Sequence, residues 1–163
     1  MIPAQFDYRA IDEQHTDQLG RQLGRLLPNA FIVTLDGNLG AGKTRLTQAI
    51  AIGLEIPTGQ VKSPTFTLSI PHSGRLELLH VDAYRINQLS EVDELGLDDW
   101  LELGGVLIIE WANRISAALP PVDLAIKIET ETETCRAFQL IGQTAKGAEI
   151  VKRLETWATT DKS

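Results

Sequence analysis

The chain has 163 residues, of which 43% are hydrophobic, and Cys135 is its single cysteine. This length and composition suffice for one globular core, so we expect one domain over residues 1–163, and a lone cysteine excludes an internal disulfide. Fifteen basic residues against 22 acidic ones give a net charge of −7, the wrong sign for a protein that binds nucleic acid by neutralising phosphates. The same charge is ordinary for a soluble protein. We therefore expect any contact with RNA to be made through a partner.

Acidic residues limit the most hydrophobic stretches, because Asp36, Asp82 and Glu110 interrupt or end them. No run approaches the roughly 18 apolar residues that span a bilayer, and the chain starts without an apolar leader segment. These features predict a cytoplasmic protein with no insertion into a membrane.

The first third of the chain has the order helix, strand, glycine-rich turn, helix. Leucines recur at helical spacing over residues 12–27 and predict an amphipathic helix, which Pro28 ends. The short apolar run 31–35 is typical of a buried strand. Apolar residues return at helical spacing over 43–54, with Gly53 as the expected C-terminal cap.

The middle of the chain predicts a hairpin of strands 66–70 and 76–81. Short helices are expected at 90–95 and 98–103, and a second fully apolar strand at 106–109.

The last part predicts two further strands and a helix. Residues 122–129 alternate roughly between apolar and polar, residues 137–141 are expected to pair with them, and a helix is expected over 147–158. The apolar strands favour a parallel centre and the tail an antiparallel extension. The predicted fold class is therefore α/β, a three-layer P-loop NTPase fold with a mostly parallel central sheet extended by antiparallel strands.

Residues 37–44, Gly-Asn-Leu-Gly-Ala-Gly-Lys-Thr, match the phosphate-loop pattern G-x-x-x-x-G-K-[ST] in full. Glycines let the backbone wrap a phosphate, so that amide groups and the positive end of the next helix face the anion. Lys43 is expected to reach the β and γ phosphates, and the Thr44 hydroxyl to ligate magnesium. At about 7% glycine usage, a chance match is on the order of one in a hundred; the competing interpretation is a glycine-rich turn that caps a helix. The remaining residues expected to contact the nucleotide along this segment are Asn38, Leu39, Gly40, Ala41, Gly42 and Arg45.

Two carboxylates follow largely apolar strands: Asp82 after residues 76–81 and Glu110 after residues 106–109. Parallel strands present their carboxyl ends to the crevice where ligands bind, so both acids are expected beside the phosphate loop, near magnesium and the attacking water. Each acid alone is more often a cap or a surface residue. Which of the two ligates the metal and which orients the water stays open.

Two further features have both a functional and an ordinary interpretation. Thr65, in Ser-Pro-Thr at 63–65, is either a sensor of the γ phosphate or part of a turn. Trp111 is either core packing or a wall of the site.

Two other motifs are weak. Residues 93–96 fit the D-x-x-G of GTPase switches, but no apolar strand precedes them and a short helix explains them better. His15, His72 and His80 lack metal-ligand spacing with one another or with Cys135, so a zinc site is not expected.

The phosphate loop, then Ser-Pro-Thr-Phe-Thr-Leu at 63–68, His-Val-Asp-Ala-Tyr-Arg at 80–85 and Glu-Trp at 110–111, in this order and spacing, resembles the TsaE family. The resemblance covers nearly the whole chain. It implies a small bacterial ATPase, binding ATP or ADP with Mg²⁺, that supports threonylcarbamoyladenosine modification of tRNA next to the anticodon. The implied partners are TsaB-like and TsaD-like subunits of the threonylcarbamoyl transferase, with tRNA contacted only indirectly.

The resemblance also implies roles by position. It implies that Lys43 and Thr44 hold phosphate and magnesium and that Thr65 belongs to a switch-like loop. It also implies that Asp82 and Glu110 lie near the metal and the attacking water. Further nucleotide contacts are implied for Glu13 and Arg136.

The chain departs from the family pattern at two places. Asn38 stands where an acid is common, and Asn113 follows where an acid is frequent, which removes any acidic contact at that position.

Other functions remain compatible with the residues alone. A small-molecule kinase would use Arg85, Arg114 and Arg136 on the transferred phosphate, but no lid is evident. A GTP-driven switch lacks the N-K-x-D element for guanine, so ATP is favoured. A scaffold that binds nucleotide without turnover is the third alternative.

Overall fold

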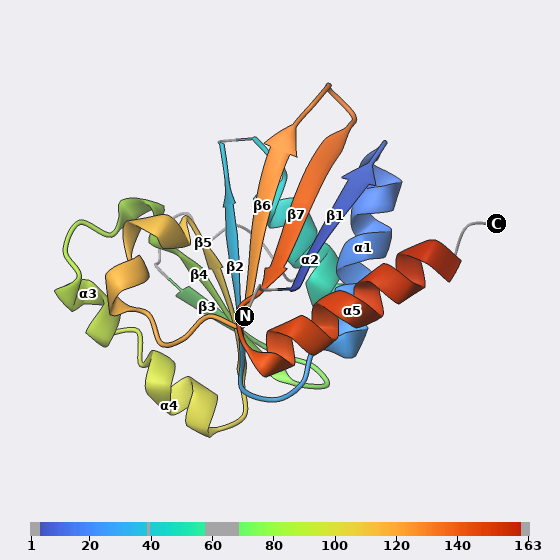
Figure 1. Cartoon of the computed structure of the whole chain (residues 1–163). Coiled ribbons are helices and arrows are strands. Elements are labelled where there is room, and N and C mark those ends of the chain that lie inside the picture. Colours follow the sequence, from blue (N-terminus) through green and yellow to red (C-terminus); the bar gives the residue numbers. More distant parts are fainter. Residues whose placement is uncertain (1–3, 39, 58–68, 161–163) are drawn as a thin grey trace.

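The computed structural model describes residues 4–38, 40–57 and 69–160, which form a sheet of seven strands with helices on both faces (Figure 1). The strands are β1 (Ala4–Ala10), β2 (Phe31–Gly37), β3 (Ser69–Ser73), β4 (Glu77–Asp82), β5 (Val106–Glu110), β6 (Leu124–Thr130) and β7 (Arg136–Gly142). The helices are α1 (Glu13–Leu26), α2 (Lys43–Gly53), α3 (Ser90–Asp93), α4 (Leu97–Glu102) and α5 (Ala145–Thr160). Short 3₁₀ turns occupy Ala83–Arg85, Ala112–Arg114 and Ser116–Ala118.

The sheet has the strand order β1-β7-β6-β2-β5-β4-β3. Its four central strands, β6, β2, β5 and β4, are parallel neighbours, whereas β7 and β1 extend one edge and β3 the other in antiparallel pairing. The predicted α/β class, with a mostly parallel centre and antiparallel edges, is therefore confirmed. One detail differs from the expectation of an antiparallel tail, because β6 pairs parallel to β2, with Val33 opposite Leu124.

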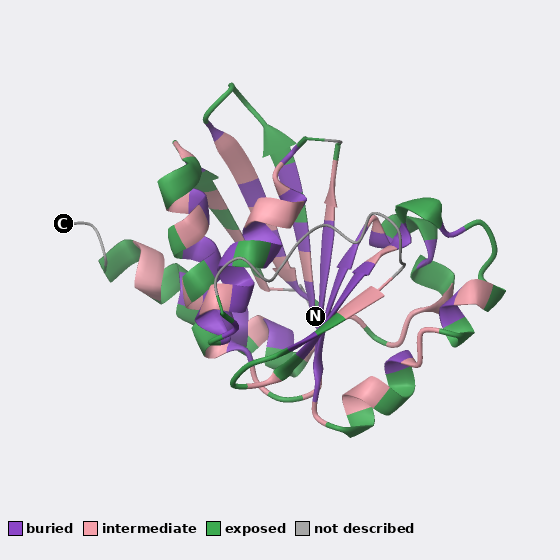
Figure 2. Ribbon diagram, turned by 180° about the vertical axis from the view of Figure 1, so that it is seen from behind, coloured by how far each residue is buried: buried purple, intermediate pink, exposed green. Residues whose placement is uncertain are grey.

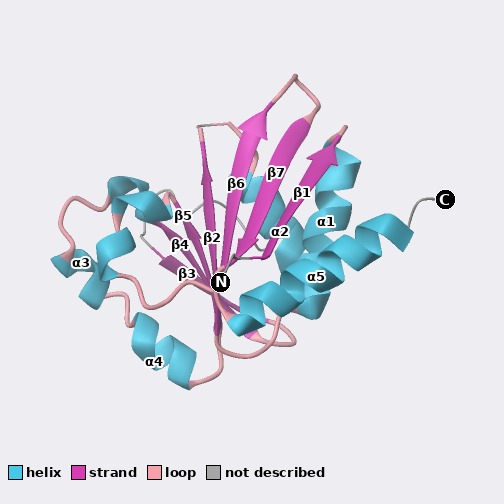
Figure 3. Ribbon diagram, viewed as in Figure 1, coloured by secondary structure: helices cyan, strands magenta, loops and turns pink. Residues whose placement is uncertain are grey.

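Helices α1, α2 and α5 lie on one side of the sheet, and α3 and α4 lie on the other (Figure 3). Alternate residues of β2 divide between the two cores, since Val33 and Leu35 pack toward α1 and α2 while Ile32 packs toward the α3 and α4 side. The central strands β2 and β5 are buried along most of their length (Figure 2). This explains why both appear in the sequence as continuous apolar runs.

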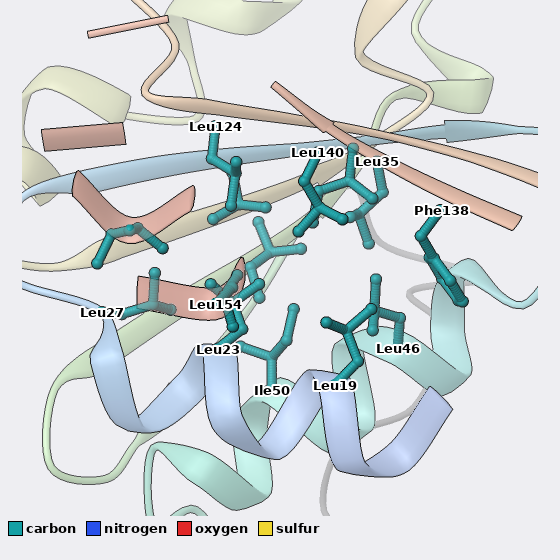
Figure 4. Close-up of a cluster of buried hydrophobic side chains, with 14 of the residues drawn as sticks. Leu19, Leu23, Leu27, Leu35, Leu46, Ile50, Leu124, Phe138, Leu140 and Leu154 are labelled. Carbon is teal, nitrogen blue, oxygen red and sulfur yellow. The ribbon is translucent and has the colours of Figure 1, made fainter. Parts of the chain in front are cut away.

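The larger core is filled mainly by aliphatic side chains from the helices and the sheet, with Phe138 beside them (Figure 4). Leu19 and Leu23 of α1 meet Leu46 and Ile50 of α2, and all four are fully buried. Because these side chains come from the helix that follows the glycine turn and from its neighbour, the packing fixes where α2 begins.

Backbone contact between α1 and α2 corrects the expected role of Gly53. The residue at the C-terminal cap is Leu54, and Gly53 lies inside the helix against α1. A Cβ on Gly53 would stand 2.2 Å from the carbonyl oxygen of Arg21, so glycine is required here for close helix packing.

Replacing Gly24 with alanine is expected to destabilise the fold by about 1–3 kcal/mol. Its Cβ would lie 2.2 Å from the carbonyl oxygen of Ile50 and 2.8 Å from Cα of Gly53, and neither backbone atom can rotate away. This clash outweighs the helix propensity of alanine, worth about 1 kcal/mol. Urea unfolding would measure the loss, with exposed Gln18→Ala on the same helix as a control expected to change stability by less than about 0.5 kcal/mol. Equal stability of both variants would contradict the packing argument.

The remaining boundaries shift by a few residues. Asp12 is the N-cap of α1 and accepts a hydrogen bond from the amide of His15. The predicted hairpin is present as β3 and β4, but β3 runs on to Ser73, and residues 66–68 of the predicted strand lie outside the described residues. Strand β1 was not predicted.

Among the helices of the described ranges, none combines the length and apolar character needed to cross a membrane.

Candidate functional site

The turn between β2 and α2, called the phosphate turn below, has the backbone of an anion cradle. Gly40 and Gly42 have φ angles of 78° and 103°, in the left-handed region that favours glycine. A Cβ on either residue would meet no described atom within 4 Å, so the backbone faces open space. Helix α2 begins at Lys43 directly after Gly42, which directs the positive end of an 11-residue helix at that space. Leu39, also expected to contact the nucleotide, lies outside the described residues.

The ammonium group of Lys43 is folded back onto the turn. Its Nζ donates to the carbonyl oxygens of Gly37 (2.6 Å) and Asn38 (2.9 Å) and lies 4.1 Å from the ring centroid of Trp111. Burial lowers the pKa of Lys43, and the charges of Glu110, Asp82 and Asp36 oppose that shift. The side chain is therefore placed between the phosphate turn and the predicted acids.

Asp82 and Glu110 lie side by side at the carboxyl ends of β4 and β5. The two residues are direct register partners in the parallel ladder. Glu110 is buried and its Oε2 contacts Nε2 of buried His80, whereas Asp82 is half-buried and accepts a hydrogen bond from the amide of Tyr84 at 2.9 Å. The structure thus brings together the two acids that lie far apart in the sequence.

These groups open onto one cleft with a volume of about 270 Å³. It is lined by Gly40, Gly42, Lys43, Thr44, Arg45, Asp82, Glu110 and Trp111. Glycine backbone, one ammonium, one hydroxyl and two carboxylates at one cleft suit a polyphosphate with a divalent cation.

Trp111 is a wall of this cleft. It is half-buried, its φ is 59°, and its amide donates to the carbonyl of Leu35 at 3.1 Å, which continues the sheet contact past the end of β5. Its ring packs against Tyr84, with centroids 5.0 Å apart. The indole therefore closes one side of the cleft, over Lys43.

Arg45 is held at the cleft by acids of α1. It makes two hydrogen bonds to Asp17, at 2.9 and 3.1 Å, and an ion pair to Glu13 at 3.1 Å. Glu13 therefore meets the cleft through Arg45 and does not line it. Asp17 was missed from the sequence, although Glu13 and Asp17 stand four residues apart on one helix face, which is a usable signal.

The predicted contacts Arg136, Ala41 and Asn38 are not among the residues that line this cleft. Arg136 donates to the carbonyl of Ala41 at 3.1 Å and so contacts the phosphate turn from outside, while Ala41 itself is buried. Asn38 lines a separate hollow of about 570 Å³ with Asp36, Asn113 and neighbouring residues. Thr65 and the rest of its Ser-Pro-Thr loop lie outside the described residues.

The kinase alternative requires Arg85, Arg114 and Arg136 near the transferred phosphate, and their positions give it little support. Arg136 is engaged by the carbonyls of Ala41, Thr132, Glu133 and Cys135, and none of the three arginines lines the cleft. Among the described residues, no group of three histidine, cysteine or acidic side chains has the arrangement of a metal site.

Asp82→Asn is expected to stabilise the nucleotide-free, magnesium-free protein at neutral pH. Burial is the main cause that raises the pKa of Asp82 above its ordinary value of 3.8, so the ionised carboxylate destabilises the folded state at higher pH. The gain from Asn should be complete above the raised pKa, shrink as the pH falls through it, and vanish below 3.8. Thermal melts of both proteins between pH 3 and 8 would test this, and a variant less stable than wild type at pH 7 would contradict it.

Comparisons with known proteins agree on one family. Residues 10–138 match the family model for the threonylcarbamoyl adenosine biosynthesis protein TsaE. The chain is similar to tRNA threonylcarbamoyladenosine biosynthesis proteins TsaE of Bacillus subtilis (38% identical over 126 residues, 77% of this chain and 78% of that protein) and of Streptomyces coelicolor (36% over 151 residues, 90% and 96%). The crystal structure of YdiB from Bacillus subtilis superposes with a TM-score of 0.80 at 26% identity, covering 97% of this chain and 99% of that one.

Proposed function

Because this chain belongs to the TsaE family, we propose that it serves tRNA threonylcarbamoyladenosine biosynthesis as a magnesium-dependent ATP hydrolase. One observation carries the hydrolytic part of this proposal: Asp82 and Glu110 are register partners at the cleft that the phosphate turn lines. A binding module needs the turn alone, whereas hydrolysis also needs carboxylates at the metal and the attacking water.

The residues of the cleft divide into two tasks. The amides of residues 38–42 and the ammonium of Lys43 hold the phosphates, with Arg45 and Trp111 at the sides of the bound nucleotide. Lys43 must then leave the carbonyls of Gly37 and Asn38, to which it now donates. Glu13 and Arg136 support nucleotide binding indirectly. Glu13 forms an ion pair with Arg45, and Arg136 donates a hydrogen bond to the carbonyl of Ala41 in the turn.

The donor set at the cleft fits magnesium. Mg²⁺ in such sites takes one or two carboxylates, a hydroxyl, substrate phosphates and water, and the cleft offers Thr44, Asp82 and Glu110. When bound, the ion would neutralise charge on the β and γ phosphates. Thr65 belongs to the same proposal as a sensor of the γ phosphate.

The proposed partners are the TsaB-like and TsaD-like subunits of the threonylcarbamoyl transferase, in the cytoplasm. The net charge of −7 disfavours direct binding of tRNA by this chain, so the partners would bind the RNA.

The test uses the full chain with the TsaB-like and TsaD-like subunits of the same organism. Phosphate release from ATP and threonylcarbamoyladenosine on tRNA are measured with each component left out in turn. We expect slow release by the chain alone, faster release in the assembly, and modification over many turnovers only when the chain and ATP are both present. Nucleotide binding without phosphate release under any of these conditions would leave only the scaffold function.

A further inference from the structure

His80 is a buried histidine to which the proposed function has so far given no task. Its side chain is fully buried within β4, and Nε2 contacts Oε2 of Glu110 on the neighbouring strand. His80 is the register partner of Ile108, two residues before Glu110. Both side chains therefore point to the α1 and α2 face of the sheet, which is also the face of the cleft.

The chemistry of this contact defines its direction. An ionised glutamate only accepts hydrogen bonds, so Nε2 of His80 carries the proton and donates a hydrogen bond to Oε2. A buried carboxylate without a partner is strongly disfavoured, and Glu110 is 3% exposed. With Oε2 held by His80, Oε1 is the oxygen that remains for the cleft.

A second buried histidine gives an internal comparison. His72, on β3, is 8% exposed, and neither its Nε2 nor Nδ1 of His80 has a hydrogen-bond partner within the described part of the chain. His72 is the register partner of Leu78, two residues before His80, so the two histidines are diagonal neighbours on one face. The structure shows Glu110 bonded to His80 and not to His72.

We propose that His80 is a positioning residue for ATP hydrolysis: its Nε2–H fixes the Glu110 carboxylate so that one oxygen faces the metal and the attacking water. This role rests on the proposed function. It differs from simple burial of a polar pair, because it requires the orientation of Glu110, and not only its solvation, to govern turnover.

The kinetic test compares His80→Leu, His80→Gln, Glu110→Gln and the double variant His80→Leu/Glu110→Gln in the complete assembly. His80→Leu should lower turnover by about 10–100-fold, the range for partners that orient a ligand, while the ADP dissociation constant stays within about 3-fold. His80→Gln, whose amide reaches the same carboxylate, should restore most of the loss. In the Glu110→Gln background, His80→Leu should change turnover by less than about 2-fold.

His72→Leu is the matched control, since it removes a buried histidine from the neighbouring strand without touching Glu110. Its turnover should stay within about 2-fold of wild type. The positioning role is overturned if His80→Leu turns over like His72→Leu, or if the losses from His80→Leu and Glu110→Gln multiply in the double variant.

A spectroscopic arm decides the geometry even where a variant folds poorly. In ¹⁵N spectra of the wild-type histidine rings, His80 should be the tautomer protonated at Nε2, and Glu110→Gln should shift this nitrogen while leaving His15 unchanged. A tautomer protonated at Nδ1 would overturn the inference. A wild-type assembly that releases no phosphate would refute the proposed function and this role with it. Loss of turnover in Glu110→Gln but not in His80→Leu would refute only the positioning role.

Discussion

Lys43→Ala is expected to raise the dissociation constants of ATP and ADP by at least about 100-fold. Each charge-assisted hydrogen bond contributes about 1.5–3 kcal/mol, and every 1.4 kcal/mol changes the constant tenfold. The Nζ that now lies 2.6 and 2.9 Å from two carbonyls of the turn is the only ammonium group among the residues that line the described cleft. Titration calorimetry with and without magnesium would measure the change.

The matched control is Lys152→Ala, which removes the same charge from an exposed position on α5. Its nucleotide affinity should equal that of wild type. Because Lys43 is 6% exposed, a thermal melt of each variant establishes that the fold is retained. A folded Lys43→Ala protein that binds ATP normally would refute the assignment of the phosphate turn.

Glu110→Gln is expected to lower ATP turnover by about 100-fold or more while changing ADP affinity by less than about 3-fold. Glutamine keeps the size of the side chain and a carbonyl that can accept from His80, but it removes the negative charge that we propose acts on the metal and the attacking water. In the proposed complex the phosphates would still contact the turn and Lys43, so binding should survive. Single-turnover phosphate release in the complete assembly separates the chemical step from nucleotide exchange.

Glu155→Gln, an exposed acid on α5, controls for the loss of one negative charge and should leave turnover unchanged. Full turnover by Glu110→Gln would remove this carboxylate from the mechanism. If nucleotide affinity fell as much as turnover, Glu110 would instead contribute to nucleotide binding.

The phosphate turn and the pair of acids could be predicted because their signals are local. Eight consecutive residues specify the turn, and the strand before it and the helix after it have clear periodicities. Asp82 and Glu110 each end an apolar run, and parallel strands bring such ends together. The exact register, with Asp82 opposite Glu110, is known only from the structure.

The features that were missed depend on contacts between distant segments. Strand β1 pairs with β7, so that Asp7 lies opposite Gln139. No sequence pattern near residues 4–10 indicates this pairing. Gly53 has the local pattern of a helix cap, but the nearby backbone of α1 determines its role. The spacing of His80 disfavours a zinc site and indicates no other role for its side chain, because its contact with Glu110 depends on the register of β4 and β5.

A crystal structure of the full chain with ADP, Mg²⁺ and fluoroaluminate would show whether this cleft holds the reacting phosphates and the metal. Fluoroaluminate mimics the transferred phosphoryl group. We expect phosphate oxygens on the amides of residues 38–42 and the Nζ of Lys43 released from Gly37 and Asn38 onto the phosphates. The metal should lie next to Thr44, with Asp82 and Glu110 facing the mimic. Nucleotide bound at another site, or Lys43 still bonded to both carbonyls beside a metal that neither acid approaches, would contradict this expectation.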